Sequence, residues 1–121
     1  MPDVLTHKGS CHCGAVAYEV DTDLSTVIEC NCSHCFRKGL WLTFVEPEAF
    51  RVTSGEPVQA EYLFNKHNIR HAFCPTCGVE SFATGVTPDG KTMMAVNIRT
   101  LTDVAPFSVE PGFRYDGLDS L

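Results

Sequence analysis

The segment Cys74-Pro75-Thr76-Cys77-Gly78 has the form of a zinc knuckle. In such a turn the backbone N–H groups point at the two sulfurs, and the glycine adopts a left-handed conformation without a Cβ penalty. A second pair, Cys11-His12-Cys13-Gly14, also ends in glycine, and its one-residue spacer requires a bend. Together the two pairs supply four thiolates, which predicts a closed structural zinc linked to folding. The alternative is two separate reactive pairs.

Three further cysteines lie in Cys30-Asn31-Cys32-Ser33-His34-Cys35. Three thiolates cap only one face of a tetrahedron, so either a histidine closes the site or an exchangeable water leaves it reactive. His71, just before the knuckle, is the strongest candidate for a closing ligand, ahead of His12, His34 and His67. Because one short loop holds this metal, we expect it to exchange more readily than the first.

Cysteines in a chain of this length can also form a disulfide scaffold. Their number here is seven, which is odd, and the one-residue spacing is too short for an easy bridge. No charged and apolar leader precedes the first motif. These features favour metal binding in a reducing cytoplasm over disulfides or unrelated free thiols.

Length and charge limit the remaining possibilities. A chain of 121 residues predicts a single domain over residues 1–121, in which cross-links contribute to stability. The formal net charge is −6, and the nine lysines and arginines form no run, so we do not expect nucleic acid as a partner. No apolar stretch approaches the roughly 20 residues needed to cross a bilayer. The expected partner is a small molecule, and the oligomeric state is left open.

Short alternating segments predict a mainly β fold with very little helix. The predicted strands are Ala15–Val20, Trp41–Val45, Glu61–Phe64, Val79–Thr84 and Met93–Ile98. Thr87–Lys91 is expected to close a hairpin between the last two strands, and Ser54–Pro57 to form a turn. Single helical turns are expected at Pro47–Phe50 and Thr100–Asp103, and the tail after Pro106 is expected to be irregular.

The charge of a three-thiolate zinc indicates its chemistry. Such a zinc is electron-rich and acidifies water poorly, which argues against hydrolysis. It can take a substrate thiol as its fourth sulfur and hold it deprotonated beside a carbonyl carbon. The natural reactions are thiol addition to an aldehyde and its reverse, carbon–sulfur cleavage. In this interpretation Cys30, Cys32 and Cys35 hold the catalytic metal, and His34 and Glu80 are candidate proton shuttles.

Several segments resemble the glutathione-dependent formaldehyde-activating enzyme family, also named after centromere protein V. They are Gly9–Val16, Cys30–Cys35, Phe73–Gly78 and Asn97–Asp103, the last being similar to that family's final strand and turn. The resemblance implies several coiled antiparallel β-sheets around a structural zinc, like the Rab-binding suppressor of Sec-four proteins. It implies carbon–sulfur lyase chemistry of the S-hydroxymethylglutathione type. It also implies two zinc ions, a structural one at Cys11, Cys13, Cys74 and Cys77 and a catalytic one at Cys30, Cys32 and Cys35.

A glutathione site should offer cations, because glutathione is an anionic ligand. Cationic side chains close to the cysteine motifs in sequence are Arg37, Lys38, Lys66, His67 and Arg70, whose alternative role is a solvated surface. Aromatic residues that could wall such a pocket, or simply form core, are Phe36, Trp41 and Phe44.

Two other functions use the same residues. One is a non-enzymatic zinc module that docks a protein partner, with both metals present for stability. The other is a thiol or zinc redox sensor, in which oxidation bridges Cys35 to Cys30 or to Cys32 and releases metal. The fourth ligand of the second site distinguishes a closed structural zinc from an open reactive one.

Overall fold

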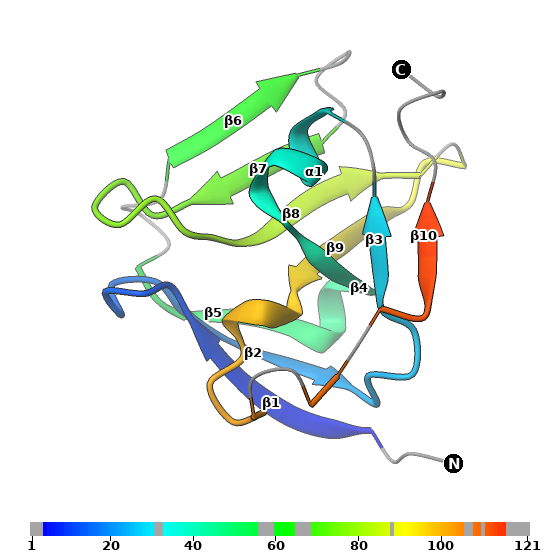
Figure 1. The fold of residues 1–121 in the computed structure, drawn as a ribbon, viewed down its shortest axis with the longest axis horizontal. Helices are drawn as coiled ribbons and strands as arrows, with labels where there is room; N and C mark the ends of the chain where they lie inside the picture. The colour runs from blue at the N-terminus through cyan, green and yellow to red at the C-terminus, as the bar shows by residue number, and fades with distance from the viewer. Residues whose placement is uncertain are drawn as a thin grey trace.

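The computed structural model describes residues 4–30, 33–55, 60–64, 69–87, 89–105, 108–109 and 111–115. Two β-sheets make up most of this structure (Figure 1). The smaller sheet is antiparallel, has the order β1-β2-β5 and consists of β1 (Leu5–Ser10), β2 (Ala17–Thr22) and β5 (Phe50–Ser54). Among the described residues, no helix is long and apolar enough to cross a membrane.

The larger sheet has seven strands in the order β10-β3-β4-β9-β8-β7-β6. Its strands are β3 (Ile28–Cys30), β4 (Trp41–Val45), β6 (Ala60–Phe64), β7 (Ile69–Phe73), β8 (Glu80–Val86), β9 (Thr92–Asn97) and β10 (Phe113–Tyr115). Its pairs are antiparallel except for β10 with β3, which is parallel. The described helical elements are α1 (Ser33–Lys38), η1 (Pro47–Ala49) and η4 (Ile98–Thr100).

The predicted mainly β fold is confirmed, and the predicted strands correspond to β2, β4, β6, β8 and β9 with ends shifted by at most two residues. The hairpin between β8 and β9 is also confirmed, with the Thr87 N–H donating to the Lys91 carbonyl at 2.8 Å. The single turn at Pro47 is present as η1, whereas η4 begins at Ile98, two residues before the predicted turn. The second half of the predicted turn at Ser54–Pro57 lies outside the described residues.

Three expectations were wrong in detail. The cysteine motif was predicted as a loop, but its second half forms α1. The tail was predicted to be irregular, but Phe113–Tyr115 pairs with β3. Strands β1, β3, β5 and β7 were not predicted, because short or strongly polar segments such as Leu5–Ser10 lack a clear apolar alternation. These segments form strands because they pair with neighbouring strands, which their own sequences do not indicate.

Buried residues of both sheets pack together in two hydrophobic clusters, and a third cluster joins α1 to the larger sheet. The ring of Tyr18 from β2 packs against Phe50 from β5, with centroids 5.3 Å apart, and against Phe82 from β8 at 6.5 Å. The rings of Phe50 and Phe82 are 4.7 Å apart, so aromatic side chains from both sheets meet in one group. Gly9 allows this packing, because a Cβ there would overlap the Tyr18 ring.

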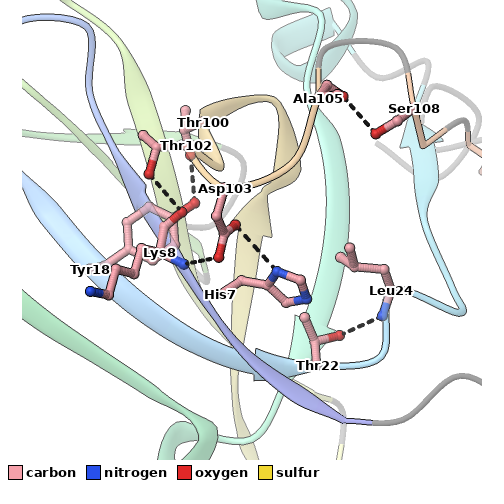
Figure 2. A network of polar contacts seen from close by, with 10 residues as sticks. All are labelled: His7, Lys8, Tyr18, Thr22, Leu24, Thr100, Thr102, Asp103, Ala105 and Ser108. Atoms are coloured by element: carbon pink, nitrogen blue, oxygen red, sulfur yellow. Dashed lines mark hydrogen bonds and ion pairs between the residues drawn. The ribbon is translucent and has the colours of Figure 1, made fainter.

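The segment after β9 ties the larger sheet to β1 (Figure 2). The Thr102 N–H donates to the Lys8 carbonyl at 2.8 Å, and the Lys8 N–H donates to Asp103 Oδ2 at 3.1 Å. In the interior, the hydroxyl groups of Tyr18 and Thr100 lie 2.6 Å apart. These bonds fix η4, which carries Arg99, relative to both sheets.

Candidate functional site

Two tight loops present the four cysteines of the two short pairs. One follows β1 and the other joins β7 to β8, and both lie at the same side of the molecule in Figure 1. Each is closed by a hydrogen bond from the N–H of its first cysteine, at 3.0 Å from Cys11 to the Val16 carbonyl and 3.1 Å from Cys74 to the Val79 carbonyl. The two loops therefore have the same local design, although their sequences differ in spacing.

The glycine after each pair adopts the conformation that the sequence predicts. Gly14 has a φ of 83° and Gly78 a φ of 79°, in the left-handed region that favours glycine. These turns aim backbone N–H groups at sulfur, as shown by the Val16 N–H, whose nitrogen lies 3.3 Å from Cys11 Sγ. The backbone of each loop is thus arranged to stabilise thiolates.

The four sulfurs of Cys11, Cys13, Cys74 and Cys77 lie within 4.8 Å of one another. Cys13 Sγ is 3.7 Å from Cys11 Sγ and 3.6 Å from Cys74 Sγ. Zn–S bonds of about 2.3 Å in a tetrahedron give S–S edges of about 3.8 Å. The donor set and its spacing therefore fit one zinc ion, and we call these four residues the four-cysteine group.

The thiols of the four-cysteine group differ in acidity. The N–H groups of Cys13 and Val79 point at Cys77 and lower the pKa of its thiol to about 6. The Cys77 N–H likewise lowers the pKa of Cys74. The Ala15 N–H acts in the same direction on Cys13, but hydrogen bonds with the neighbouring thiols, first Cys74, outweigh it and raise the pKa of Cys13 to about 11. Binding of a divalent cation would therefore release protons from the group.

A buried polar cluster lies where α1 meets the larger sheet. Glu80, the first residue of β8, accepts a hydrogen bond from Lys38 Nζ at 2.8 Å and lies 2.8 Å from His71 Nδ1. His34 Nε2 is 3.7 Å from the same carboxylate, and the His34 and His71 rings are 3.9 Å apart. The cluster connects α1 to β7 and β8, only three residues beyond Cys77. We call these four residues the Glu80 cluster.

Two members of the Glu80 cluster, Glu80 and His34, have shifted pKa values. Burial by itself raises the pKa of Glu80, but hydrogen bonds from His71 and Lys38 outweigh it and lower that pKa, so the carboxylate is charged. Burial, followed by the proximity of His71, lowers the pKa of His34 to about 4 and keeps it neutral at pH 7. The ligand atoms of His34, His71 and Glu80 lie within 4.8 Å and could hold a zinc, although Lys38 already provides a positive partner.

A pocket of about 500 Å³ lies beside the remaining cysteines. Cys30 at the end of β3 and Cys35 in α1 border it, together with Trp41 from β4, Arg99 from η4 and Arg114 from β10. In Figure 1, β3 and β10 lie on the opposite side of the view from the two loops of the four-cysteine group. The volume lies in the range of small-molecule sites.

The predicted site residues thus fall into separate places. The members of the four-cysteine group come together, Cys30 and Cys35 border the pocket, and Cys32 lies outside the described residues. His71, the strongest candidate for a closing ligand of the second zinc, is a member of the Glu80 cluster. No disulfide joins the six cysteines of the described ranges to one another.

The cations expected at the pocket are not the ones that border it. Lys38 is directed at Glu80, Arg70 is exposed elsewhere, and Arg37 does not line the pocket. Lys66 and His67 lie outside the described residues. Arg99 and Arg114 take this place instead. Both lie more than 60 residues from Cys35 in the chain, so proximity in sequence could not identify them; the one available signal was the Asn97–Asp103 segment.

The aromatic expectation was correct in part. Phe36 and Trp41 border the pocket. Phe44 is exposed on β4 and is neither a pocket wall nor part of the core. Phe44 shares a face of β4 with Leu42, because side chains two residues apart point to the same side of a strand, but only Leu42 is buried there, in a cluster with Cys35 of α1.

The fold and the four-cysteine group together define a mainly β protein with a four-cysteine group that could hold a zinc ion and a separate cysteine-bordered pocket. The family model of the glutathione-dependent formaldehyde-activating enzymes matches residues 6–114, and the chain belongs to this family. The crystal structure of a protein from Rhodobacter sphaeroides, a structural-genomics target, is similar to this chain with a TM-score of 0.78 and 29% sequence identity. The alignment covers 88% of this chain and 98% of that one.

Proposed function

We propose that this protein is a zinc-dependent carbon–sulfur lyase that acts on an adduct between an aldehyde and glutathione or another low-molecular-weight thiol. The observation that carries this proposal is that Cys30 and Cys35 border an open pocket, whereas the sulfurs of the four-cysteine group face one another. Membership of the family supports glutathione and formaldehyde as reactants. S-Hydroxymethylglutathione is the substrate to assay first.

The second metal would be held by Cys30, Cys32 and Cys35. The thiol donor set suits zinc, and two of its members reach the pocket wall from different elements, a strand end and a helix. When bound, a zinc held by three thiolates supplies one open position at which a substrate sulfur is kept deprotonated. The chain's own task is to admit the adduct to this position and to accept its proton.

In the cleavage direction, the hydroxyl proton of the adduct leaves and the O–H electron pair becomes part of the aldehyde carbonyl. The carbon–sulfur bond breaks, and its electron pair stays on sulfur as the released thiolate. Glu29 is the carboxylate among the described residues that line the pocket, next to Cys30. We assign it the role of accepting the hydroxyl proton, directly or through water.

The two earlier candidates for proton transfer are placed less well. Glu80 is buried and held by Lys38 and His71, and neither Glu80 nor His34 lines the pocket. We therefore assign the Glu80 cluster a positioning role: it holds α1, which carries Cys35, against the larger sheet. This leaves Glu29 as the carboxylate that can meet a ligand.

Cys32→Ala tests the proposal most directly. Native mass spectrometry should count two zinc ions in the wild type and one in the variant, which should keep its fold. Formaldehyde release from S-hydroxymethylglutathione should fall on the order of 10³-fold or more, because the open metal position is lost. His12→Ala is the matched control, since His12 is an exposed side chain close to a metal group and should change neither value. Unaltered turnover in Cys32→Ala would contradict the proposal, and loss of the fold would make the second site structural.

A further inference from the structure

Arg99 stands out among the charged residues of the pocket wall. Its guanidinium carbon lies 4.7 Å from the centroid of the Trp41 ring, in a cation–π contact. Both residues also line a smaller cavity of about 190 Å³, whose other lining residues are apolar, so the pair lies between that cavity and the main pocket. Arg99 Nη1 would be 3.8 Å from a Cβ at Gly39, just after α1. The cation therefore lies between the cysteine-bearing helix and the aromatic wall.

The backbone that carries Arg99 is fixed from the interior. Its N–H donates to Asn97 Oδ1 at 3.2 Å, and Asn97 Nδ2 donates to the Glu80 carbonyl at 2.9 Å. Thr100 Oγ1 donates to the Asn97 carbonyl at 2.7 Å. Asn97 and Thr100 are both buried, whereas Arg99 itself is exposed. An exposed cation on a rigid buried turn is a preorganised binding group.

The two arginines of the wall differ in their acidic partners. Glu29 accepts hydrogen bonds from Trp41 Nε1 at 3.1 Å and from Arg114 Nε at 3.2 Å, so Arg114 already has an acidic partner. Within the part of the chain that the structure describes, Arg99 has no acidic side chain in ion-pair distance. This contrasts with a chain of net charge −6, in which a cation would readily find an acidic neighbour. Among the described residues of the wall, Arg99 is therefore the cation that is available to a ligand.

We propose that Arg99 binds a carboxylate of the substrate and is the residue by which the pocket prefers carboxylate-bearing thiol adducts to uncharged ones. The assignment of the ligand as a thiol adduct rests on the proposed function. The cation–π contact holds the guanidinium against the Trp41 ring, and the fork of N–H donors of an arginine suits a two-point contact with a carboxylate. A lysine could not reproduce this arrangement, because it lacks both the planar stacking surface and the fork of donors.

The test uses S-methylglutathione and its diethyl ester, two thioethers that cannot be cleaved as adducts, in titration calorimetry with the zinc-loaded protein. For Arg99→Met, the dissociation constant of the acid should rise about 10- to 100-fold, the range of a charge-assisted contact, while that of the ester stays within about twofold. Arg99→Lys should recover only part of the loss. The control is Arg70→Met, which removes the same charge from an exposed position outside the pocket and should leave both constants unchanged.

Equal weakening of the acid and the ester in Arg99→Met, or no binding of S-methylglutathione to the wild type, would overturn the inference. A purely structural role of Arg99 would lower the melting temperature without changing the acid-to-ester ratio, and this outcome would overturn it as well. Turnover is measured separately on S-hydroxymethylglutathione. Selective binding without any turnover would reject the lyase function and keep the role of Arg99, whereas turnover equal in wild type and Arg99→Met would reject the role of Arg99 alone.

Discussion

The two cysteine regions of this protein both offer sulfur atoms as ligands, but they arrange them differently. The four-cysteine group joins loops that are distant in the chain, since Cys13 and Cys74 are 61 residues apart, and its sulfurs face one another. Cys30 and Cys35 belong to one short segment and border a pocket instead. In the first region a metal would connect parts of the fold, and in the second it would connect the fold to a ligand.

This difference follows from chain entropy as much as from coordination. Closing a loop of 61 residues costs about 3.7 kcal/mol of chain entropy, from the (3/2)RT ln n term. A cross-link between Cys13 and Cys74 therefore offsets a substantial entropic cost of folding. A metal held between Cys30 and Cys35 closes almost no loop and adds little to the stability of the fold. A metal in the second region can therefore lack one protein ligand without a large loss of stability. Removing a cysteine ligand should then affect the stability of the fold differently in the two regions.

Cys74→Ser should have the largest effect. Structural zinc contributes an apparent 10–16 kcal/mol or so, which is comparable with the whole stability of a domain, about 5–15 kcal/mol. Cys74 is also buried, so the serine hydroxyl would face sulfurs and apolar side chains. We expect loss of cooperative thermal unfolding and of near-ultraviolet circular dichroism. Cys32→Ala is the matched comparison and should unfold cooperatively; the same collapse in both variants would remove the distinction between the regions.

The sequence was sufficient for the four-cysteine group because its evidence is local. Each pair of cysteines, with the glycine that follows, determines its own turn, and the count of four thiolates predicts that the two turns meet, as they do in the structure. The short alternating segments also predicted five of the strands and the hairpin at Thr87–Lys91. Both kinds of evidence depend on a few neighbouring residues, which is why single-sequence reasoning reached them.

The pocket could not be predicted in the same way, because its wall is assembled from distant elements. Arg99 and Arg114 approach Cys35 only after β4 pairs with β9 and β10 pairs with β3. The Glu80 cluster was missed for a similar reason, since His71, Lys38 and Glu80 meet across α1, β7 and β8. Here register and topology, rather than residue type, decide which charges become partners.

Glu80→Gln tests how far the two regions depend on each other. The change removes a buried negative charge that faces Lys38 and His71, and should lower the free energy of unfolding by about 2 kcal/mol, since Lys38 can turn toward water and glutamine keeps one hydrogen bond. Glu19→Gln, at the more exposed pair with Arg51, should cost less than about 1 kcal/mol. Urea unfolding measures both. Equal losses would mean that the Glu80 cluster is no stronger than a surface ion pair.

Glu80→Gln should also change how the free energy of unfolding depends on pH in acid. The folded-state pKa of Glu80 is lowered, with burial opposing and the hydrogen bonds from His71 and Lys38 prevailing. Its contribution is therefore fully present above the unfolded pKa, about 4.3, and is lost as the pH falls through the folded-state value. The stability difference between wild type and Glu80→Gln should shrink below about pH 4. A difference that stays constant from about pH 7 to about pH 3 would show that the carboxylate charge is not its source.

The smallest expected effect is a difference between the two zinc ions in the rate at which a chelator removes them. A colorimetric zinc chelator in excess should take one equivalent from the wild type at least about tenfold faster than the other, because a metal held by one short segment beside a pocket can be reached without opening the fold. Release from the four-cysteine group requires the two loops to separate, and Cys11 and Cys74 are buried. Cys32→Ala should show the slow phase alone, and added glutathione should change only the fast phase. A single phase in the wild type, insensitive to glutathione, would mean that the second zinc is as closed as the first, and the division between a folding metal and a reacting metal would then fail.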